Sequence, residues 1–172
     1  MEDKSKKLVD LLIKENIKFS ITSHPAFFTV KESKSFKQNI KGAHTKNLFL
    51  KNKKNNFFLL SCKDNTIVDL KKIKKNSLFG NISFANESYL KDYLNLTPGS
   101  VTPFGLLFDS NNIVKFYLDN KLLKYEVVNF HPLINTSTVS LNTSDFIHFM
   151  KLQKKVVNYF NFDTCQIVYG WK

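Results

Sequence analysis

Three short segments of the chain carry residue types that could do chemistry, and the first surrounds Lys46. It has the sequence GAHTKNLFL over residues 42–50, so Lys46 stands at the head of an apolar stretch typical of a strand. Strand pairing would hold its backbone, and its ammonium could then face a cleft as a point charge for a phosphate or a developing oxyanion. An ordinary solvent-exposed strand lysine is the alternative interpretation.

The second segment is a loop with the sequence TPGSVTPFG over residues 97–105. It holds two prolines and two glycines in nine residues, which indicates a rigid connection with a defined shape. Glycine lets a ligand approach the backbone closely, and proline removes a backbone donor. The loop could therefore aim carbonyls and amides at a small group, although a tight connection without a ligand fits the pattern equally well.

The third segment, FHPLINTST over residues 130–138, places His131 directly after an apolar stretch and follows it with Asn135 and hydroxyl side chains. A histidine in such a polar cluster could act as a general acid or base, or as a hydrogen-bond donor. A purely structural histidine is the alternative. His24, between a serine and a proline, is equally ambiguous, whereas His148 has apolar neighbours and is better explained by packing.

Several kinds of catalytic centre have no motif in this sequence. There is no nucleophile elbow, phosphate-binding P-loop, dinucleotide-binding glycine pattern or HExxH zinc motif. Cys62 and Cys165 belong to no Cys-x-x-Cys pair and no Cys/His cluster, so neither a disulfide scaffold nor a zinc site is expected. If the chain is a hydrolase, we expect water to be its nucleophile, with no metal and no cofactor.

Length and composition favour one globular domain. The chain has 172 residues, of which 42% are hydrophobic, enough for a single core. Its N-terminus does not resemble a signal peptide, and its apolar runs are far shorter than the roughly 20 residues of a membrane span. We therefore expect a cytoplasmic protein with no membrane partner.

The charge of the chain points to a polyanionic partner. Its net charge is +12, and all 26 basic residues are lysine. Residues 1–86 carry 18 lysines against 7 acidic residues, whereas residues 87–172 carry 8 against 7. One basic half suits a nucleic acid approaching from one side, although a solvated surface in a lysine-rich proteome is the alternative. Without arginine, the bidentate reading of guanine in duplex DNA is not expected.

The pattern of apolar and capping residues predicts alternating helices and hairpins. Predicted helices cover residues 4–15, 70–75, 87–94 and 145–154, and one more helix is predicted to start near Thr29. Asp69 and Asn86 are the predicted N-caps of the helices over residues 70–75 and 87–94, and Asn142 or Ser144 is the predicted N-cap of the last helix. Predicted strands cover residues 18–22, 45–50, 57–62, 80–84, 104–108, 113–118, 125–130 and 137–141. The segment after Val157 shows no clear helix or strand period in its apolar residues. These elements predict an α+β or mixed α/β fold with a largely antiparallel sheet.

Taken together, these segments resemble one family. The stretches HPAFFTV, GAHTKNLFL, VDLKK, SFANESYLKDYLNLTPGSVTPFGL and FHPLINTSTVSL occur in the order found in free-standing editing deacylases of the YbaK/ProX superfamily, which are related to the insertion domain of bacterial prolyl-tRNA synthetase. The resemblance covers residues 5–155 and is greatest to the Ala-tRNA(Pro) deacylases. It implies an editing domain over residues 1–155, with residues 156–172 as a C-terminal extension of unassigned role.

The resemblance also implies a fold and a set of site residues. The family fold is a mixed sheet curled into a partial barrel with flanking helices. The strand lysine of the family corresponds to Lys46, which would contact the terminal adenosine of the tRNA. The GxxxP loop of the family corresponds to residues 99–103, which would line the amino-acid pocket and help to place the hydrolytic water. The implied catalytic residues are Lys46, Gly99, Ser100, Thr102, Pro103 and His131. The implied substrate-binding residues are Phe27, Phe28, Thr29, Asn47, Val101 and Asn135.

The activity implied by the resemblance is hydrolysis of mischarged tRNA, with Ala-tRNA(Pro) as the expected substrate. Cys-tRNA(Pro) is the nearest rival substrate. A non-catalytic RNA-binding module on the same fold is a second hypothesis, because lysines and aromatic residues stand close together over residues 51–58. A partner-binding protein that has lost activity is the third. The expected partners are tRNA and, as a further candidate, prolyl-tRNA synthetase.

Overall fold

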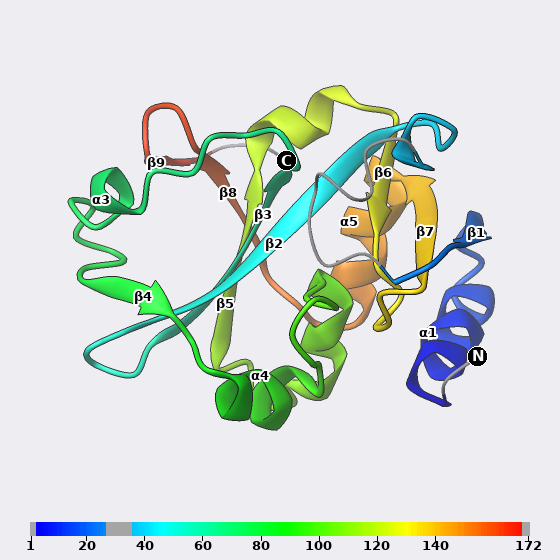
Figure 1. Cartoon of the computed structure of the whole chain (residues 1–172), viewed down its shortest axis with the longest axis horizontal. Coiled ribbons are helices and arrows are strands. Elements are labelled where there is room, and N and C mark those ends of the chain that lie inside the picture. Colours follow the sequence, from blue (N-terminus) through cyan, green and yellow to red (C-terminus); the bar gives the residue numbers. More distant parts are fainter. Residues whose placement is uncertain (1–2, 27–35, 170–172) are drawn as a thin grey trace.

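The computed structural model describes residues 3–26 and 36–169, which form an open mixed sheet with helices packed against it (Figure 1). The strands are β1 (Phe19–Ser23), β2 (Ala43–Asn52), β3 (Phe57–Lys63), β4 (Ile82–Phe84), β5 (Val114–Asp119), β6 (Val127–Phe130), β7 (Ser137–Asn142), β8 (Val157–Asn161) and β9 (Gln166–Val168). The helices are α1 (Asp3–Lys14), α3 (Leu70–Ile73), α4 (Glu87–Leu94) and α5 (Thr143–Leu152), with 3-10 turns η1 (Pro103–Phe108) and η2 (Asn120–Lys124).

The sheet has the strand order β1-β7-β6-β2-β3-β5-β8-β9, and β4 pairs with β2 outside this path. Five of the pairings are antiparallel and three, namely β2 with β6, β3 with β5 and β5 with β8, are parallel. The predicted fold class, a mixed and largely antiparallel sheet with flanking helices, is confirmed. Among the described strands the sheet begins at β1 and ends at β9, so it is not closed into a barrel.

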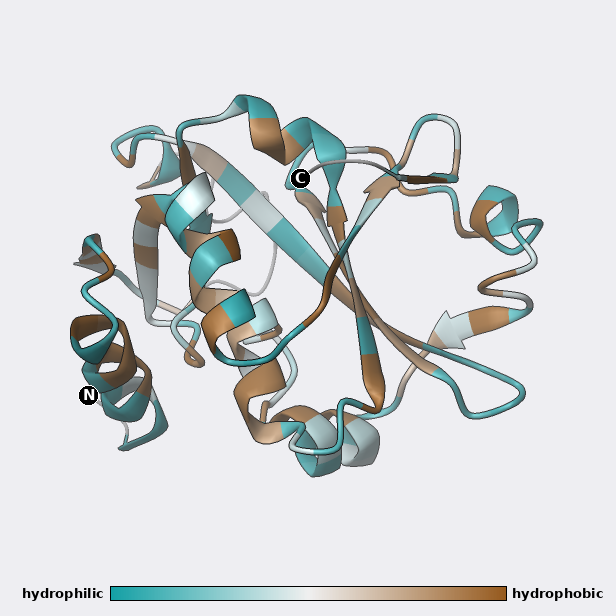
Figure 2. Cartoon of the chain, turned by 180° about the vertical axis from the view of Figure 1, so that it is seen from behind, coloured by the Kyte–Doolittle hydropathy of each residue, from teal (hydrophilic) through white to brown (hydrophobic). Residues whose placement is uncertain are grey.

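Successive residues of a strand point to opposite faces, and β3 is buried on both. Phe57 and Leu59 face a main core that also contains the buried aromatic residues of η1, β6 and α5. Phe58, Leu60 and Cys62 face a second core on the other side of the sheet. α5 shows both apolar and polar positions along its length (Figure 2), and its apolar side packs into the main core.

Most predicted elements are present, with small shifts of their ends. Asp69 and Asn86 cap α3 and α4 as predicted, each through a side chain that accepts a backbone N–H three residues on. α3 is shorter than predicted, ending at Ile73, and α5 begins at Thr143, two residues before its predicted start. The helix predicted from Thr29 lies outside the described residues.

The strand predicted over residues 104–108 is wrong, because this segment is the 3-10 turn η1. Pro103 has no N–H for a strand ladder but suits the first position of a helical turn. Gly105 lies so close to the end of α4 that an added Cβ would sit 2.7 Å from Leu96 Cδ1. A short apolar run cannot distinguish a strand from a buried turn, and here the close packing against α4 favours the turn.

The tail after residue 156 contains two strands that the sequence did not predict. β8 pairs parallel with β5, and β9 pairs antiparallel with β8, so this segment completes one end of the sheet. Phe160, Phe162 and Cys165 are buried in the second core. Residues 157–168 are therefore part of the same sheet as the rest of the described chain.

Candidate active site

The predicted strand and loop meet at Asn47. Asn47 lies opposite Ser61 in the pairing of β2 with β3, and the Ser61 hydroxyl donates a hydrogen bond of 2.5 Å to Asn47 Oδ1. The Asn47 Nδ2 amino group donates to the carbonyl of Val101 at 2.9 Å. Since a carbonyl only accepts, the amide must point its nitrogen at Val101, and the serine then matches its oxygen. This chain of bonds ties the loop of residues 99–103 to the sheet.

The loop itself is held by its own polar side chain. Gly99 has φ of 86°, a conformation that favours glycine. Ser100 is 2% exposed, and its hydroxyl donates to the Thr97 carbonyl at 2.8 Å and accepts from the Thr97 amide at 3.2 Å. Thr102 is fully buried, with no partner for its hydroxyl among the described residues. The hydroxyl of Ser100 thus shapes the loop, and Pro103 begins η1 directly after it.

Lys46 lies on the other face of β2 from Asn47. It is paired with Cys62, a member of the second core, and its half-buried side chain donates a hydrogen bond to the carbonyl of Thr66. Among the described residues it makes no ion pair, so its charge is not neutralised. Burial raises the pKa of the Cys62 thiol to about 12, against the opposing effect of the Lys46 ammonium, so Cys62 is no thiolate nucleophile at neutral pH.

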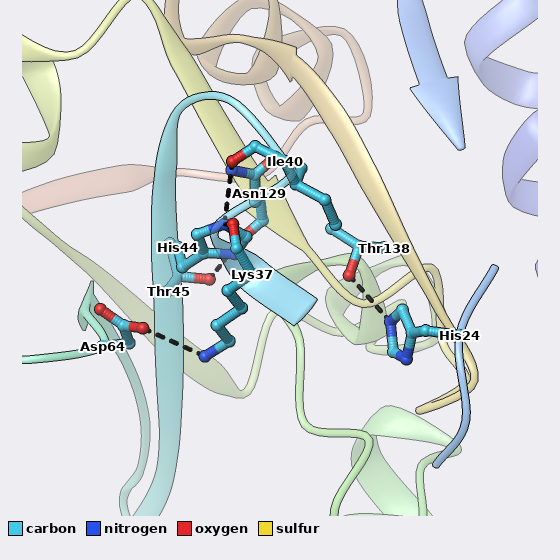
Figure 3. Close-up of polar contacts among 8 residues, drawn as sticks. All are labelled: His24, Lys37, Ile40, His44, Thr45, Asp64, Asn129 and Thr138. Carbon is cyan, nitrogen blue, oxygen red and sulfur yellow. Dashed lines mark hydrogen bonds and ion pairs between the residues drawn. The ribbon is translucent and has the colours of Figure 1, made fainter. Parts of the chain in front are cut away.

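His131 and His24 form a pair beside the end of β6, with ring centroids 6.2 Å apart. His131 Nδ1 lies 3.2 Å from the Ser137 carbonyl, so Nδ1 carries the proton and Nε2 is the acceptor in the neutral ring. Burial lowers the pKa of His131, although the bond to the Ser137 carbonyl acts in the opposite direction. His24 Nε2 lies 3.0 Å from the Thr138 hydroxyl (Figure 3). Asn135 is half-buried in the same connection between β6 and β7.

A polar cluster that the sequence did not predict fixes residues 36–41 over the start of β2 (Figure 3). Lys37 forms an ion pair with Asp64 at 3.1 Å, and His44 Nε2 donates to the carbonyls of Lys37 and Ile40 at 3.0 and 3.2 Å. Burial lowers the pKa of His44, so it is a neutral donor here. The spacings of these residues follow no helix or strand period, and sequence reasoning therefore had no signal for the cluster.

The predicted site residues fall into three groups. Asn47 contacts the loop of residues 99–103, His131 is paired with His24, and Lys46 binds the loop that follows β3. Phe27, Phe28 and Thr29 lie outside the described residues. Residues 3–26 and 36–169 contain no cluster of three or more histidine, cysteine or acidic side chains that could hold a metal ion. In the same ranges no helix has the length and apolar character needed to cross a membrane.

Comparison with known proteins agrees with this architecture. Residues 24–149 match the aminoacyl-tRNA editing domain family, and the chain belongs to this family. It is 36% identical over 152 residues to the prolyl-tRNA synthetase associated domain-containing protein 1 of Mus musculus, covering 86% of this chain and 89% of the relative. It is 30% identical over 151 residues to the prolyl-tRNA editing protein ProX of Acetoanaerobium sticklandii, covering 87% of this chain and 92% of that protein.

Solved structures share the fold. One, described as a proposed trans-editing enzyme for prolyl tRNA synthetase, superposes with a TM-score of 0.67 and 19% identity over 91% of this chain and 96% of the other. At this level of identity the likeness establishes the fold alone. The family and fold implied by the sequence motifs are thus confirmed, and the chain is related to the ProX editing proteins.

Proposed function

We propose that this protein is an aminoacyl-tRNA deacylase that hydrolyses the ester of mischarged tRNA, with Ala-tRNA(Pro) as its substrate. The observation that carries the proposal is the pair of hydrogen bonds from Ser61 to Asn47 and from Asn47 to the Val101 carbonyl. These bonds attach the glycine- and proline-containing loop of residues 99–103 to β2, the strand that carries Lys46, within a domain of the editing family. The activity is assigned to the cytoplasm, with prolyl-tRNA synthetase as a further candidate partner.

The reaction needs no covalent intermediate, because an aminoacyl ester is already activated. Water adds to the ester carbonyl carbon, the bond to the ribose oxygen breaks, and the water proton passes to that oxygen, giving the free amino acid and tRNA. Main-chain groups of residues 99–103 would position the ester and the water, and the positive charge of Lys46 would hold the terminal nucleotide. His131, neutral at pH 7, presents Nε2 as a proton acceptor.

Size exclusion would select the substrate. A pocket distinguishes side chains that differ by a methylene by only about 1–3 kcal/mol, so a synthetase for proline cannot fully reject alanine. A site bounded by a compact loop would admit alanine and exclude the larger proline ring. Phe27 and Phe28 are proposed as the bulky wall of this pocket. Cysteine is close enough to alanine in size that Cys-tRNA(Pro) is the competing substrate.

The test is hydrolysis of labelled aminoacyl-tRNA. Ala-tRNA(Pro), Cys-tRNA(Pro), Pro-tRNA(Pro) and Ala-tRNA(Ala) are compared at equal concentration, with each tRNA alone as the control for spontaneous loss. We expect Ala-tRNA(Pro) to be cleared fastest and Pro-tRNA(Pro) to be spared. Preference for Cys-tRNA(Pro) would reassign the substrate within the same activity. Tight tRNA binding without hydrolysis of any ester would replace the enzyme by an RNA-binding module.

A further inference from the structure

α3 and the turn after it carry an unusually concentrated positive charge. Residues 69–77 contain four lysines and a single acidic residue, Asp69, whose carboxylate is used as the N-cap of the helix. All four lysines, Lys71, Lys72, Lys74 and Lys75, are exposed. None of them forms an ion pair with another described residue. Residues three or four positions apart on a helical turn have Cβ atoms about 5–6 Å apart, so these four lysine side chains are neighbours and form one basic patch.

The C-terminal strands hold this basic turn in place. Ile73 and Phe79 are fully buried in the second core together with Phe160 of β8. Asn76 Nδ2 donates to the Cys165 carbonyl at 3.0 Å, and Lys72 Nζ donates to the Asp163 carbonyl at 2.7 Å. Figure 1 shows α3 and β9 together at one end of the molecule, with α1 at the other end. The segment after residue 156 is therefore the support on which the basic turn rests.

The basic turn is connected to the candidate active site by a very short segment. Lys46 binds the carbonyl of Thr66, and three residues later Asp69 caps α3. An extended chain spans at most about 3.6 Å per residue, so the start of α3 lies within about 11 Å of Thr66. A stacked nucleic-acid strand advances about 3.4 Å per nucleotide, so this distance corresponds to at most about three nucleotides. Lys46 is paired with Cys62, which belongs to the second core together with Ile73, so Lys46 and Ile73 lie on the same face of the sheet.

We propose that Lys71, Lys74 and Lys75 form a docking surface for the phosphate backbone of the tRNA acceptor arm, supported by the hairpin of β8 and β9. The inference rests on the proposed function and adds the surface that carries the RNA beyond its terminal nucleotide. Lysine ammoniums act as point charges that neutralise phosphates without reading bases, which suits a chain without arginine. The patch contacts phosphates in the stem while Lys46 contacts the strand end.

The experiment compares two triple variants of equal charge. The test variant carries Lys71→Ala, Lys74→Ala and Lys75→Ala, leaving Lys72 to hold Asp163. The control variant carries Lys6→Ala, Lys14→Ala and Lys18→Ala, which removes three exposed lysines at the opposite end. Each is assayed on Ala-tRNA(Pro) and on the alanyl ester of adenosine, which has no phosphate for the patch to contact. tRNA binding is measured across a salt series.

For the test variant we expect KM for Ala-tRNA(Pro) to rise about tenfold or more at low salt, with kcat and the rate on the adenosine ester unchanged. The slope of log affinity against log salt should become shallower by about 2, since each lost phosphate contact removes about 0.7–0.9. The control variant should stay within about twofold of the parent. Equal losses in both variants, or loss of activity on the adenosine ester, would overturn the inference. A parent that binds tRNA through this patch but hydrolyses nothing would instead refute the proposed function alone.

Discussion

The hydroxyl of Ser61 and the side-chain oxygen of Asn47 lie 2.5 Å apart on paired positions of β3 and β2, and this bond fixes which way the Asn47 amide faces. Ser61 is fully buried, so water cannot replace its hydroxyl. The bond matters for the site because the same amide, through its nitrogen, holds the carbonyl of Val101 in the loop of residues 99–103.

Ser61→Ala should therefore loosen the loop without touching it. The half-buried Asn47 oxygen then loses its hydrogen bond to Ser61, and such a loss costs about 0.5–1.5 kcal/mol. We expect lower stability by about that amount and a reduced single-turnover rate on Ala-tRNA(Pro), with a shifted Asn47 side-chain amide signal in NMR. Ser140→Ala is the matched control, because the buried Ser140 hydroxyl has no partner among the described residues. An unchanged rate and amide signal in Ser61→Ala would exclude this positioning role.

Lys46→Ala should keep the fold and lose most of the deacylation. A charge-assisted contact is worth about 1.5–3 kcal/mol, which corresponds to roughly 10- to 150-fold in rate. Lys46→Arg should restore only part of it, because a planar guanidinium does not replace a compact ammonium. Lys115→Ala, an exposed lysine of β5, is the control. A folded Lys46→Ala protein within threefold of the parent rate, judged by circular dichroism and single-turnover kinetics, would remove Lys46 from the mechanism.

The rate should fall at acid pH because of His131. Burial holds the pKa of His131 below its ordinary value of about 6.5, so the ring is neutral at pH 7 and takes up a proton only in more acid solution. Activity should be flat above the ordinary value and fall as pH drops through the lowered one. The same shift means that the unfolded chain binds more protons, so stability from this group is present above the ordinary pKa and is lost as pH falls.

His131→Gln should lower the rate and remove that acid limb, as measured by kcat/KM against pH. His44 also has a pKa lowered by burial, so His44→Gln is measured beside it to assign the limb. His148, for which the sequence favoured packing, is exposed on α5, so His148→Gln is the control and should leave the profile intact. An acid limb that persists in His131→Gln would assign it to another group.

Hydrolysis should not depend on a metal ion. The sequence has no metal-binding motif, and the proposed chemistry uses main-chain groups, a lysine and water. We expect full activity after exhaustive EDTA treatment when a polyamine keeps the tRNA folded. Activity that vanishes in EDTA and returns only with zinc would contradict the mechanism, whereas recovery with any divalent ion would reflect the RNA.

Sequence reasoning succeeded where local signals and tertiary structure agree. The Asp69 and Asn86 caps are set by bonds within three residues, and the hairpin of β2 and β3 by apolar stretches around a polar tip. The sequence motifs also brought Asn47 and residues 99–103 into one hypothesis, and the structure places them in contact.

The features that the sequence did not predict depend on contacts between distant parts of the chain. η1 forms because Gly105 packs against Leu96, and β8 exists because β5 offers a parallel partner 41 residues earlier, where Phe116 faces Val157. The pairing of Lys37 with Asp64, and the choice of Thr66 as the partner of Lys46, likewise follow no local period. A single sequence carries no signal for such pairings.

The two faces of β3 have a consequence for the order in which the two cores of the protein can form. The last buried residue of the main core is Met150, whereas the second core needs Phe160, Phe162 and Cys165. Every buried residue of the main core therefore precedes, along the chain, the aromatic residues that close the second core. Until Phe160, Phe162 and Cys165 have packed, Phe58, Phe79 and Tyr117 are only partly covered on that face of the sheet. A folding intermediate in which the main core has formed but β8 has not yet paired would therefore expose these aromatic rings and be prone to aggregate.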